Sequence, residues 1–562
     1  GGGGTDTLTY AAFGGLSTIR VDLGNSTDFQ GNVDTFSGIS NFIGTNHFDE
    51  IYLAASGTAS VTAGTAGASF YANTGTHILN GGGYGYLSFF YVTTASIVID
   101  LSLTTAQASG YGTYSLTNFN DMDGGSLDDT LTGTNGINYL GGNDGNDTLA
   151  GLDGTDFLYG GEGNDVANGG NDNDELSGEN GNDTLNGDDG NDTIYGGAGN
   201  DVIDGGAGTG DWVIYNTSSA LVVVNLQTGT ATGEGTDTLT NIENIFGSLY
   251  NDTLTGDGGD NYILGYAGND TLEGGTGNDT VDGGAGNDIF IGGTGNDTIT
   301  GGTNNDIIDF TGYANALNVN LQTRVITKNG GTDGSDTYTT VEGVYGGSNN
   351  DSFSASTAQG YTIRGGFGND TFAAANSIYS DVVDGGNGTD FANYGALGSV
   401  TGSFAGSSGS VSKAAGGIDT LNNVEQITTG SSADTFTLDT DSLGTFTSLD
   451  MGAGSDTIRV IDTPLAATDV GATMAGIFSN VETLDLRSMT NAGDTFGSIN
   501  GDQIFAMLGA LSTLTLQVTA GSNLANNISF TDGATFISHV TVGNTTTWSN
   551  AGATQQVVLQ IV

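Results

Sequence analysis

Residues 142–204 read GNDGNDTLA, GLDGTDFLY, GGEGNDVAN, GGNDNDELS, GENGNDTLN, GDDGNDTIY and GGAGNDVID when they are divided into blocks of nine. The sixth place of each block is Asp, from Asp147 to Asp201, without a break in phase. A second run keeps this phase from Asp252 to Asp306, with Asn261 in one of the Asp places. A fixed period over this many blocks predicts a stacked repeat architecture.

The residue types within a block predict a glycine-rich turn followed by a short strand. Glycine at places 1, 2 and 4 permits positive φ and lets backbone carbonyls converge. The apolar residue two places after each Asp is expected to point inward and stack on its counterpart one coil away. These residues are Leu149, Leu158, Leu176, Leu185, Ile194, Ile203, Leu272, Val281, Phe290, Ile299 and Ile308. We therefore predict an all-β chain, a right-handed parallel β-roll or β-helix solenoid with two blocks in each coil.

Stacking the coils brings acidic side chains together. Asp147 would meet Asp165, and their carboxylates would repel each other unless a cation bridged them. Carboxylates and converging carbonyls form a hard oxygen site, which suits Ca²⁺ better than Mg²⁺ or a transition metal. The predicted Ca²⁺ ligands, which would hold multiple structural ions, are Asp147, Asp156, Asp165, Asp174, Asp183, Asp192, Asp201, Asp252, Asp270, Asp279, Asp288, Asp297, Asp306 and Asp370.

The composition agrees with a cation as the natural partner. The 562 residues include 100 Gly, one Pro and no Cys, and 64 Asp and Glu stand against 7 Lys and Arg. The net charge of −57 excludes nucleic-acid binding through a basic surface, and without Cys there is no disulfide framework. The sequence contains no apolar run of the roughly 18 residues that insertion across a membrane requires.

A longer repeat, called a cassette here, interrupts the blocks of nine. Cassette A covers residues 210–256, cassette B covers 305–353 and cassette C covers 386–439. Each contains two Asp residues 15 apart, such as Asp237 and Asp252 in cassette A. Further copies are predicted at 1–54, in degenerate form with Tyr114 at 81–133, and through 452–486. Because the phase resumes after each cassette, we predict wider coils of the same solenoid.

Two residue classes recur at fixed cassette positions. The aromatic residues Trp212, Tyr215, Phe310 and Tyr394 are expected in the cassette core rather than as sugar-binding platforms. The acidic residues Glu243, Glu342, Glu425 and Glu482 predict a repeated structural role, either turn hydrogen bonding or an additional Ca²⁺ ligand.

Beyond Asp485 the Gly-Asn-Asp signature disappears, and a compact β-rich cap is predicted, with strands at LTLQV, NISF, HVTV and QQVVLQIV and a short helix at GDQIFAMLGAL. The predicted organisation is degenerate cassettes at 1–133, a first nonapeptide array at 134–210, a cassette at 211–256, a second array at 257–306, cassettes with sparse nonapeptides at 307–485 and the cap at 486–562.

The nonapeptide blocks over about 130–310 resemble the repeats-in-toxin (RTX) family of bacterial proteins secreted by type I systems. The segments VETLDLRSM, INGDQIFAML and STLTLQV, with the stretch from Trp548 to the end, resemble the C-terminal module of large type I secreted adhesins and surface proteins such as S-layer proteins. This second resemblance implies an uncleaved export signal in residues 486–562.

Motifs for attached enzymes are missing from the sequence. His47, His77 and His539 are scattered and none lies in H-E-x-x-H, and no G-x-S-x-G occurs. A β-helix lyase or epimerase acting on uronates would need clustered basic residues. The chain's basic residues are isolated: Arg20, Arg324, Lys328, Arg364, Lys413, Arg459 and Arg487. We therefore predict no enzymatic activity.

Three functions are compared. The first is a Ca²⁺-dependent structural protein of the cell exterior that assembles with itself into a surface layer, sheath or fibre. The second is the Ca²⁺-stiffened C-terminal stalk of an adhesin, and the third is a carbohydrate-active β-helix enzyme. The partners expected for the first are further copies of the chain and cell-surface polysaccharide or glycans.

Overall fold

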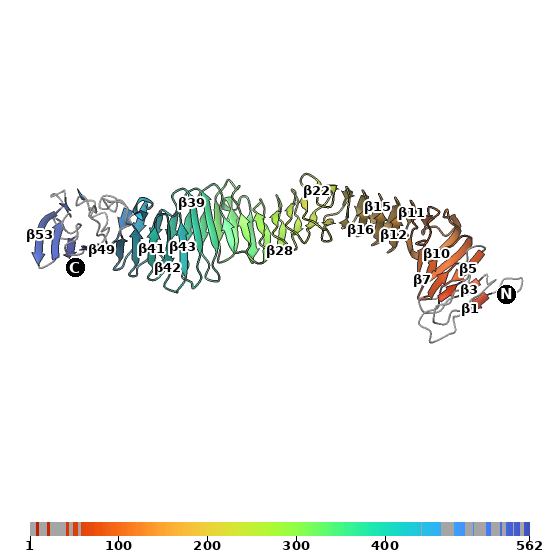
Figure 1. Cartoon of the computed structure of the whole chain (residues 1–562), viewed down its shortest axis with the longest axis horizontal. Helices are drawn as coiled ribbons and strands as arrows, with labels where there is room; N and C mark the ends of the chain where they lie inside the picture. Colours follow the sequence, from red (N-terminus) through yellow and green to blue (C-terminus); the bar gives the residue numbers. More distant parts are fainter. Residues whose placement is uncertain are drawn as a thin grey trace. The chain divides into compact units, whose positions relative to one another are not determined.

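The computed structural model describes residues 65–439, 441–461 and 477–488 and shorter stretches at 7–9, 20–22, 41–43, 49–53, 58–63, 498–499, 513–518, 529–530, 536–542, 545–550 and 556–561. The chain divides into two compact units, residues 1–286 and 287–562. Each unit contains stacked, mainly parallel strands in two sheets, as the strand arrows of Figure 1 show.

In the first unit, successive strands alternate between the two sheets from β10 to β20 and from β24 to β28, so that one coil of about 18 residues there contributes a strand to each. The first sheet contains β1 (Thr7–Thr9), β2 (Arg20–Asp22), β3 (Asn41–Ile43), β4 (Asp49–Tyr52), β5 (Thr58–Thr62), β6 (Ala68–Tyr71), β7 (Thr76–Ser88), β9 (Gln107–Ala108), β10 (Thr113–Asp123), β12 (Tyr139–Asp144), β14 (Phe157–Glu162), β16 (Glu175–Asn180), β18 (Thr193–Tyr195), β20 (Trp212–Ile214), β24 (Asn244–Phe246), β26 (Tyr262–Leu264) and β28 (Thr280–Ala285). The second contains β8 (Val98–Asp100), β11 (Thr130–Thr132), β13 (Thr148–Asp153), β15 (Val166–Asn171), β17 (Thr184–Asp189), β19 (Val202–Asp204), β21 (Val223–Asn225), β22 (Thr230–Thr232), β23 (Thr236–Thr240), β25 (Thr253–Thr255) and β27 (Thr271–Glu273).

The second unit repeats this plan. One sheet contains β30 (Thr298–Thr303), β32 (Leu317–Asn320), β33 (Val325–Lys328), β34 (Ser335–Thr339), β36 (Ser352–Ser354), β38 (Thr371–Ala373), β40 (Phe391–Asn393), β44 (Gln426–Thr428), β46 (Ser448–Asp450) and β48 (Phe478–Ser479). The other contains β29 (Ile289–Ile291), β31 (Ile307–Asp309), β35 (Gly343–Tyr345), β37 (Thr362–Phe367), β39 (Val382–Asn387), β41 (Thr401–Ala405), β42 (Ser408–Ser412), β43 (Ile418–Asn422), β45 (Thr435–Asp439), β47 (Thr457–Ile461), β49 (Thr483–Ser488), β51 (Thr513–Val518), β53 (Phe536–Val542), β54 (Thr545–Asn550) and β55 (Gln556–Ile561). The pair β50 (Ser498–Ile499) and β52 (Ser529–Phe530) is separate, and two short 3₁₀ helices are η1 (Asn329–Gly331) and η2 (Ser442–Gly444).

The core is the thin apolar column predicted from the blocks of nine. In the parallel register Leu158 of β14 faces Leu176 of β16, and neither side chain is exposed. The eleven apolar residues predicted to point inward are all buried, from Leu149 to Ile308. Their neighbours alternate outward, as the period-2 geometry of strands requires. The structure therefore confirms the β-solenoid and its inward stack.

Each of cassettes A, B and C adds antiparallel strands to one sheet. In cassette A, β23 pairs in parallel with β19, β22 pairs antiparallel with β23 and β21, and β21 pairs in parallel with β25. Strands β32–β34 in cassette B and β41–β43 in cassette C have the same pattern. The predicted widening thus takes the form of extra antiparallel strands, since the chain turns back through two short connections before the next coil begins.

Three of the four aromatic residues that were predicted in the cassette core are buried: Tyr215, Phe310 and Tyr394. Trp212 is a correction: it is half-buried on the outer face of β20, and its ring centroid lies 5.3 Å from that of Tyr262. It lies directly before the buried Val213, so the period-2 alternation of the strand turns Trp212 outward. In the C-terminal segment, β51, β52, β53 and β55 lie at the predicted strands, whereas the predicted helix at 501–511 lies outside the described residues.

Candidate metal-binding turns

The predicted Ca²⁺ ligands lie at the ends of turns, immediately before strands. Asp147 precedes β13 in one sheet and Asp156 precedes β14 in the other, so the residues form one column along each sheet. All fourteen predicted ligands are buried, with at most 6% of the residue exposed. The turns therefore hold two columns of buried carboxylates, one along each sheet.

One oxygen of each carboxylate belongs to a hydrogen-bond ladder along the column. The amide of Asp165 donates to Oδ1 of Asp183 at 2.7 Å, and the amide of Asp174 donates to Oδ1 of Asp192 at 2.7 Å. The amide of the Asp or Asn one coil earlier donates the same hydrogen bond to Oδ1 of other column members. These are Asp147, Asp156, Asp165, Asp174, Asp201, Asp270, Asp279, Asp306 and Asp370. The ladder fixes the orientation of each carboxylate and therefore also the position of its second oxygen.

The second oxygen is buried and lacks a hydrogen-bond partner among the described residues. This holds for Oδ2 of Asp147, Asp156, Asp165, Asp174, Asp183, Asp192, Asp201, Asp306 and Asp370. A buried carboxylate oxygen without a hydrogen-bond partner lowers stability, so a row of them fits a cationic partner. Two predicted ligands differ. Asp252 accepts hydrogen bonds from Val222 and Ser248, and Asp297 pairs with Lys328.

The first glycine of each block makes room beside that second oxygen. A Cβ on Gly142 would stand 2.3 Å from Oδ2 of Asp147 and 2.5 Å from the carbonyl oxygen of Gly160. A Cβ on Gly178 would stand 2.2 Å from Oδ2 of Asp183 and 2.5 Å from the carbonyl oxygen of Gly196. Glycine at place 1 is therefore required by the close approach of a carboxylate oxygen and a carbonyl oxygen.

Glycine at places 2 and 4 is required by backbone conformation. Gly161 and Gly163 have φ of 112° and 138°, in the region that residues with a side chain avoid. Place 2 tolerates some exceptions, since Leu152 has φ of 89° and Glu179 has φ of 69°. The repeat therefore uses its glycines for two physical reasons, space at place 1 and positive φ at places 2 and 4.

Burial makes the charged form of these carboxylates expensive. It raises the pKa of Asp147 to about 7, and the nearby carboxylate of Asp129 adds to the effect. Burial likewise raises the pKa of Asp174 and Asp183 to about 7. A divalent cation between the coils would stabilise the ionised carboxylates and remove this penalty.

The donor set fits Ca²⁺. Among the described residues no three His, Cys, Asp or Glu side chains gather into a group that could hold a metal by themselves, so carbonyl oxygens must complete any site. Carboxylate plus backbone carbonyl oxygens, without nitrogen or sulfur, is the ligand set that Ca²⁺ prefers. The aspartates would supply the charge, and the place 1 glycines the space in which the carbonyls approach.

Comparison with known families agrees with this chemistry. The family model of the RTX calcium-binding nonapeptide repeat matches residues 123–158, 141–176, 151–185, 177–210, 246–281 and 282–312. Residues 123–210 and 246–312 of this chain contain RTX calcium-binding nonapeptide repeats. The RTX repeats bind Ca²⁺, and their number implies several structural ions. Proteins with these repeats are typically secreted and are structural or toxin-associated. No curated protein matches the chain.

The structure adds residues that sequence reasoning left out of the columns. The hydrogen-bond ladder continues through Asp129, Asp211, Asp237, Asp336, Asp351, Asp381, Asp390, Asp419, Asp434 and Asp456. Most of these follow an interrupted or shifted block, so a strict nine-residue phase misses them. The Asp pairs 15 apart in the cassettes were the signal that could have identified several of them.

The recurring cassette glutamates belong to the same ladder. Oε2 of Glu243 accepts the amide of Asp211 at 3.0 Å, and Oε2 of Glu342 accepts the amide of Asp306 at 3.0 Å. Glu425 and Glu482 accept the amides of Asp390 and Asp456. Of the two roles predicted for these residues, turn hydrogen bonding is confirmed.

An exposed asparagine ladder runs beside the aspartate columns. Oδ1 of Asn146 accepts the amide of Asn164 at 2.8 Å, and Oδ1 of Asn164 accepts that of Asn182 at 2.8 Å. This explains the asparagine in the recurring Gly-Asn-Asp signature. It satisfies turn amides on the solvent side while the aspartate satisfies those inside.

Proposed function

We propose that this RTX-repeat protein is an extracellular Ca²⁺-dependent structural protein that assembles with itself into a surface layer, sheath or fibre. The observation that carries the proposal is the continuity of one repeating architecture within each unit. Across residues 65–461 nearly every described strand belongs to one of the stacked sheets. A chain built in this way supplies rigid, repetitive surface, which is what an ordered assembly requires.

Exposed apolar side chains support contacts between copies of the chain. Tyr91 is 76% exposed and Phe90, in edge contact with it, is 54% exposed. Ile378 is 69% exposed on a turn of the second unit. Apolar groups left in water at several turns are suited to burial against a neighbouring molecule.

The charge gives a reason for assembly outside the cell. With 57 net negative charges, the Ca²⁺-free chain is expected to resist compaction in the cytoplasm, where free Ca²⁺ is scarce. Extracellular Ca²⁺ lies in the range of the weaker extracellular sites, and its binding free energy then adds to folding. We include export by a type I system in this proposal.

A stalk that extends the binding part of an adhesin is the second candidate. The stack of coils favours it too, because a stiffened repeat also serves as a spacer.

In the part of the chain that the structure describes, no helix has the length and apolarity needed to cross a bilayer.

Electron microscopy and light scattering of the purified chain separate the two candidates. Samples would be compared in EGTA, in millimolar Mg²⁺ and in millimolar Ca²⁺. Ordered sheets, tubes or fibres in Ca²⁺ alone would support the assembling protein. Single particles in Ca²⁺ at every protein concentration would overturn it and favour the stalk. The double variant Phe90→Ser/Tyr91→Ser, which leaves the Ca²⁺ turns intact, tests whether these exposed rings take part.

A further inference from the structure

The chain contains two lysines, and both are buried at the aspartate columns. Lys328 belongs to cassette B and Lys413 to cassette C. Their residues are 0% and 4% exposed, although lysine is among the residues that are least often fully buried. A buried ammonium needs close anionic partners, and both lysines have them.

Lys328 bridges two successive members of one column. Its Nζ lies 3.0 Å from Oδ2 of Asp297 and 2.7 Å from Oδ1 of Asp336, and it donates to the carbonyl oxygen of Gly293 at 2.8 Å. Asp297 and Asp336 are also joined by the column's amide hydrogen bond, at 3.1 Å. The ammonium therefore contacts carboxylate and carbonyl oxygens of the kind expected around Ca²⁺ in the other turns.

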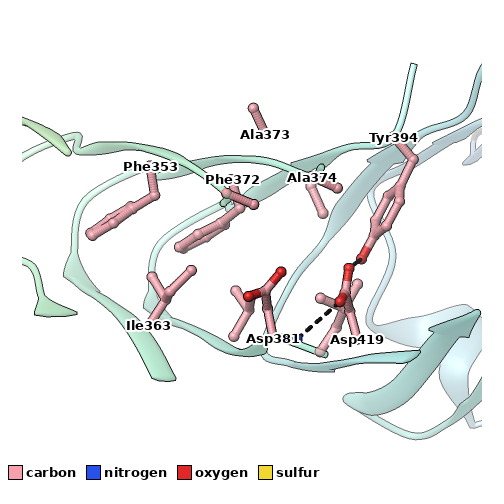
Figure 2. Close-up of a pocket in the computed structure, with 12 residues that line it drawn as sticks. Phe353, Ile363, Phe372, Ala373, Ala374, Asp381, Tyr394 and Asp419 are labelled. Atoms are coloured by element: carbon pink, nitrogen blue, oxygen red, sulfur yellow. Dashed lines mark hydrogen bonds between the residues drawn. The ribbon is translucent and has the colours of Figure 1, made fainter. Parts of the chain in front are cut away.

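Lys413 repeats this arrangement in cassette C. Its Nζ lies 2.6 Å from Oδ1 of Asp419 and 3.4 Å from Oδ2 of Asp381, and Oδ2 of Asp419 accepts the hydroxyl of Tyr394 at 3.0 Å. Figure 2 shows Tyr394 reaching Asp419 and Asp381 beside it, at the edge of a small cavity lined by Phe353, Ile363 and Phe372. Two carboxylates thus contact the ammonium of Lys413, and the hydroxyl of Tyr394 donates to one of them.

The strand register shows which residue corresponds to these lysines in cassette A. Ile326 faces Asp336 in cassette B, Val411 faces Asp419 in cassette C, and Ala231 faces Asp237 in cassette A. Each lysine lies two residues after the facing residue. The corresponding residue of cassette A is Gly233, which is exposed and carries no charge.

The anionic partners are nevertheless present in cassette A. The amide of Asp201 donates to Oδ1 of Asp237 at 3.2 Å, and Oδ2 of Asp237 accepts the hydroxyl of Tyr215 at 2.9 Å. This matches Asp381, Asp419 and Tyr394 in cassette C. Asp201 is 1% exposed, and its Oδ2 has no partner among the described residues. In cassettes B and C the equivalent oxygen, on Asp297 and Asp381, faces the lysine.

We propose that the residue at this cassette position determines whether the bridging cation is a lysine ammonium or a Ca²⁺ ion. Lys328 and Lys413 are built-in cations that take the place of Ca²⁺ and close cassettes B and C without it. Cassette A has glycine at this position and binds a Ca²⁺ ion between Asp201 and Asp237. By correspondence with Gly293, the carbonyl of Gly197 is its third ligand. Asp237 is thus a Ca²⁺ ligand outside the nine-residue phase, and the exposed Gly233 leaves the site open to the ion.

The inference predicts different Ca²⁺ dependence for matched segments of the unmodified chain. Hydrogen exchange would be followed in EGTA and in millimolar Ca²⁺ for β21–β23 and for β41–β43. In EGTA, residues 401–422 should keep their protection, whereas residues 223–240 should lose theirs and regain it with Ca²⁺. Equal loss of protection in both segments, or equal retention, would overturn the proposal.

Substitutions test whether a lysine takes the place of Ca²⁺. The bound ions are counted by equilibrium dialysis with elemental analysis. Asp237→Asn should bind one Ca²⁺ fewer than the unmodified chain, and Lys413→Gly should bind one more. Lys413→Met is the matched control, since it removes the charge but fills the space and should gain no ion. An unchanged Ca²⁺ count in both Asp237→Asn and Lys413→Gly would contradict the proposal. If a variant fails to fold, the exchange measurement on the unmodified chain decides.

Discussion

The amide of Asp147 donates a hydrogen bond of 2.7 Å to Oδ1 of Asp165, one coil further along the chain. Asp147 itself accepts the same bond from the amide of Asp129 at 2.6 Å. Each aspartate is therefore both donor and acceptor in a column, and its second oxygen is directed to the interior of the turn. Replacing one aspartate would therefore remove the acceptor of the amide one coil earlier as well as a cation ligand, whereas its own backbone amide would still donate to the next carboxylate.

Removing two aspartates from the middle of the first array should reduce Ca²⁺ binding. Asp174→Ala combined with Asp183→Ala takes one ligand from each column, so we expect a lower Ca²⁺ stoichiometry by equilibrium dialysis and faster hydrogen exchange in β15–β18. The control is Asp189→Ala, which removes an exposed carboxylate at the end of β17. Equal stoichiometry in the double variant and the control would show that Asp174 and Asp183 are not ligands.

Adding one methyl group at place 1 should disturb a turn. In Gly142→Ala the new Cβ would lie 2.3 Å from Oδ2 of Asp147, so the carboxylate must move. Overpacking of this kind costs about 1–3 kcal/mol of unfolding free energy, and weaker Ca²⁺ binding should accompany it. Gly312→Ala is the control, since no atom lies within 4 Å of its Cβ position. Urea unfolding in millimolar Ca²⁺ compares them, and equal stabilities would contradict the role given to place 1.

Acid should stabilise the Ca²⁺-free fold. Burial raises the pKa of Asp147, Asp156 and Asp174 to about 7, from an ordinary value of 3.8. Between these values the folded chain binds more protons than the unfolded chain, so stability falls as pH rises and the loss is complete above about pH 7. In EGTA the β-sheet circular dichroism should therefore persist to higher temperature at pH 5 than at pH 8.

When Ca²⁺ is present, we expect the opposite dependence on pH. Protons and Ca²⁺ compete for the same carboxylates, so Ca²⁺ affinity should rise from pH 5 to pH 8. Calorimetric titration at several pH values measures this directly. An affinity that does not change with pH would mean that the buried aspartates are ionised before the ion binds.

Shortening one core residue should weaken the whole stack near it. Leu176 lies on Leu158 and is fully buried, so Leu176→Ala should cost about 2–5 kcal/mol in the Ca²⁺-bound form. Val202→Ala is the comparison, since Val202 is 48% exposed at the start of β19. Similar unfolding free energies for the two variants would contradict the inward column.

Sequence reasoning predicted the parts of this structure that depend on period. The phase from Asp147 to Asp201 located the turns, and the apolar residue two places later located the core, because a parallel stack repeats its environment at each coil. The separate roles of the glycines did not follow from the pattern. Gly142 and Gly161 look alike in sequence, but the first is needed for space beside a carboxylate and the second for positive φ.

The direction of the strands and the lysine sites could be identified only from the structure. Alternating residues in β21 and β22 indicate strands, but alternation is the same in parallel and antiparallel pairs. Lys328 and Lys413 seemed isolated in sequence because one carboxylate partner of each, Asp297 or Asp381, lies about 30 residues earlier in the chain. A comparison of the cassettes aligned on Asp237, Asp336 and Asp419 was needed to identify their common position.

The most direct test of Ca²⁺ as the cement of this RTX-repeat protein is hydrogen exchange of residues 142–204, measured first in EGTA and then in millimolar Ca²⁺ at pH 7.5. We predict rapid exchange throughout β13–β19 in EGTA, and strong protection that appears together in all of these strands as Ca²⁺ is added. Equal protection in EGTA and in Ca²⁺ would contradict the account, because the aspartate columns would then hold the coils together without an ion.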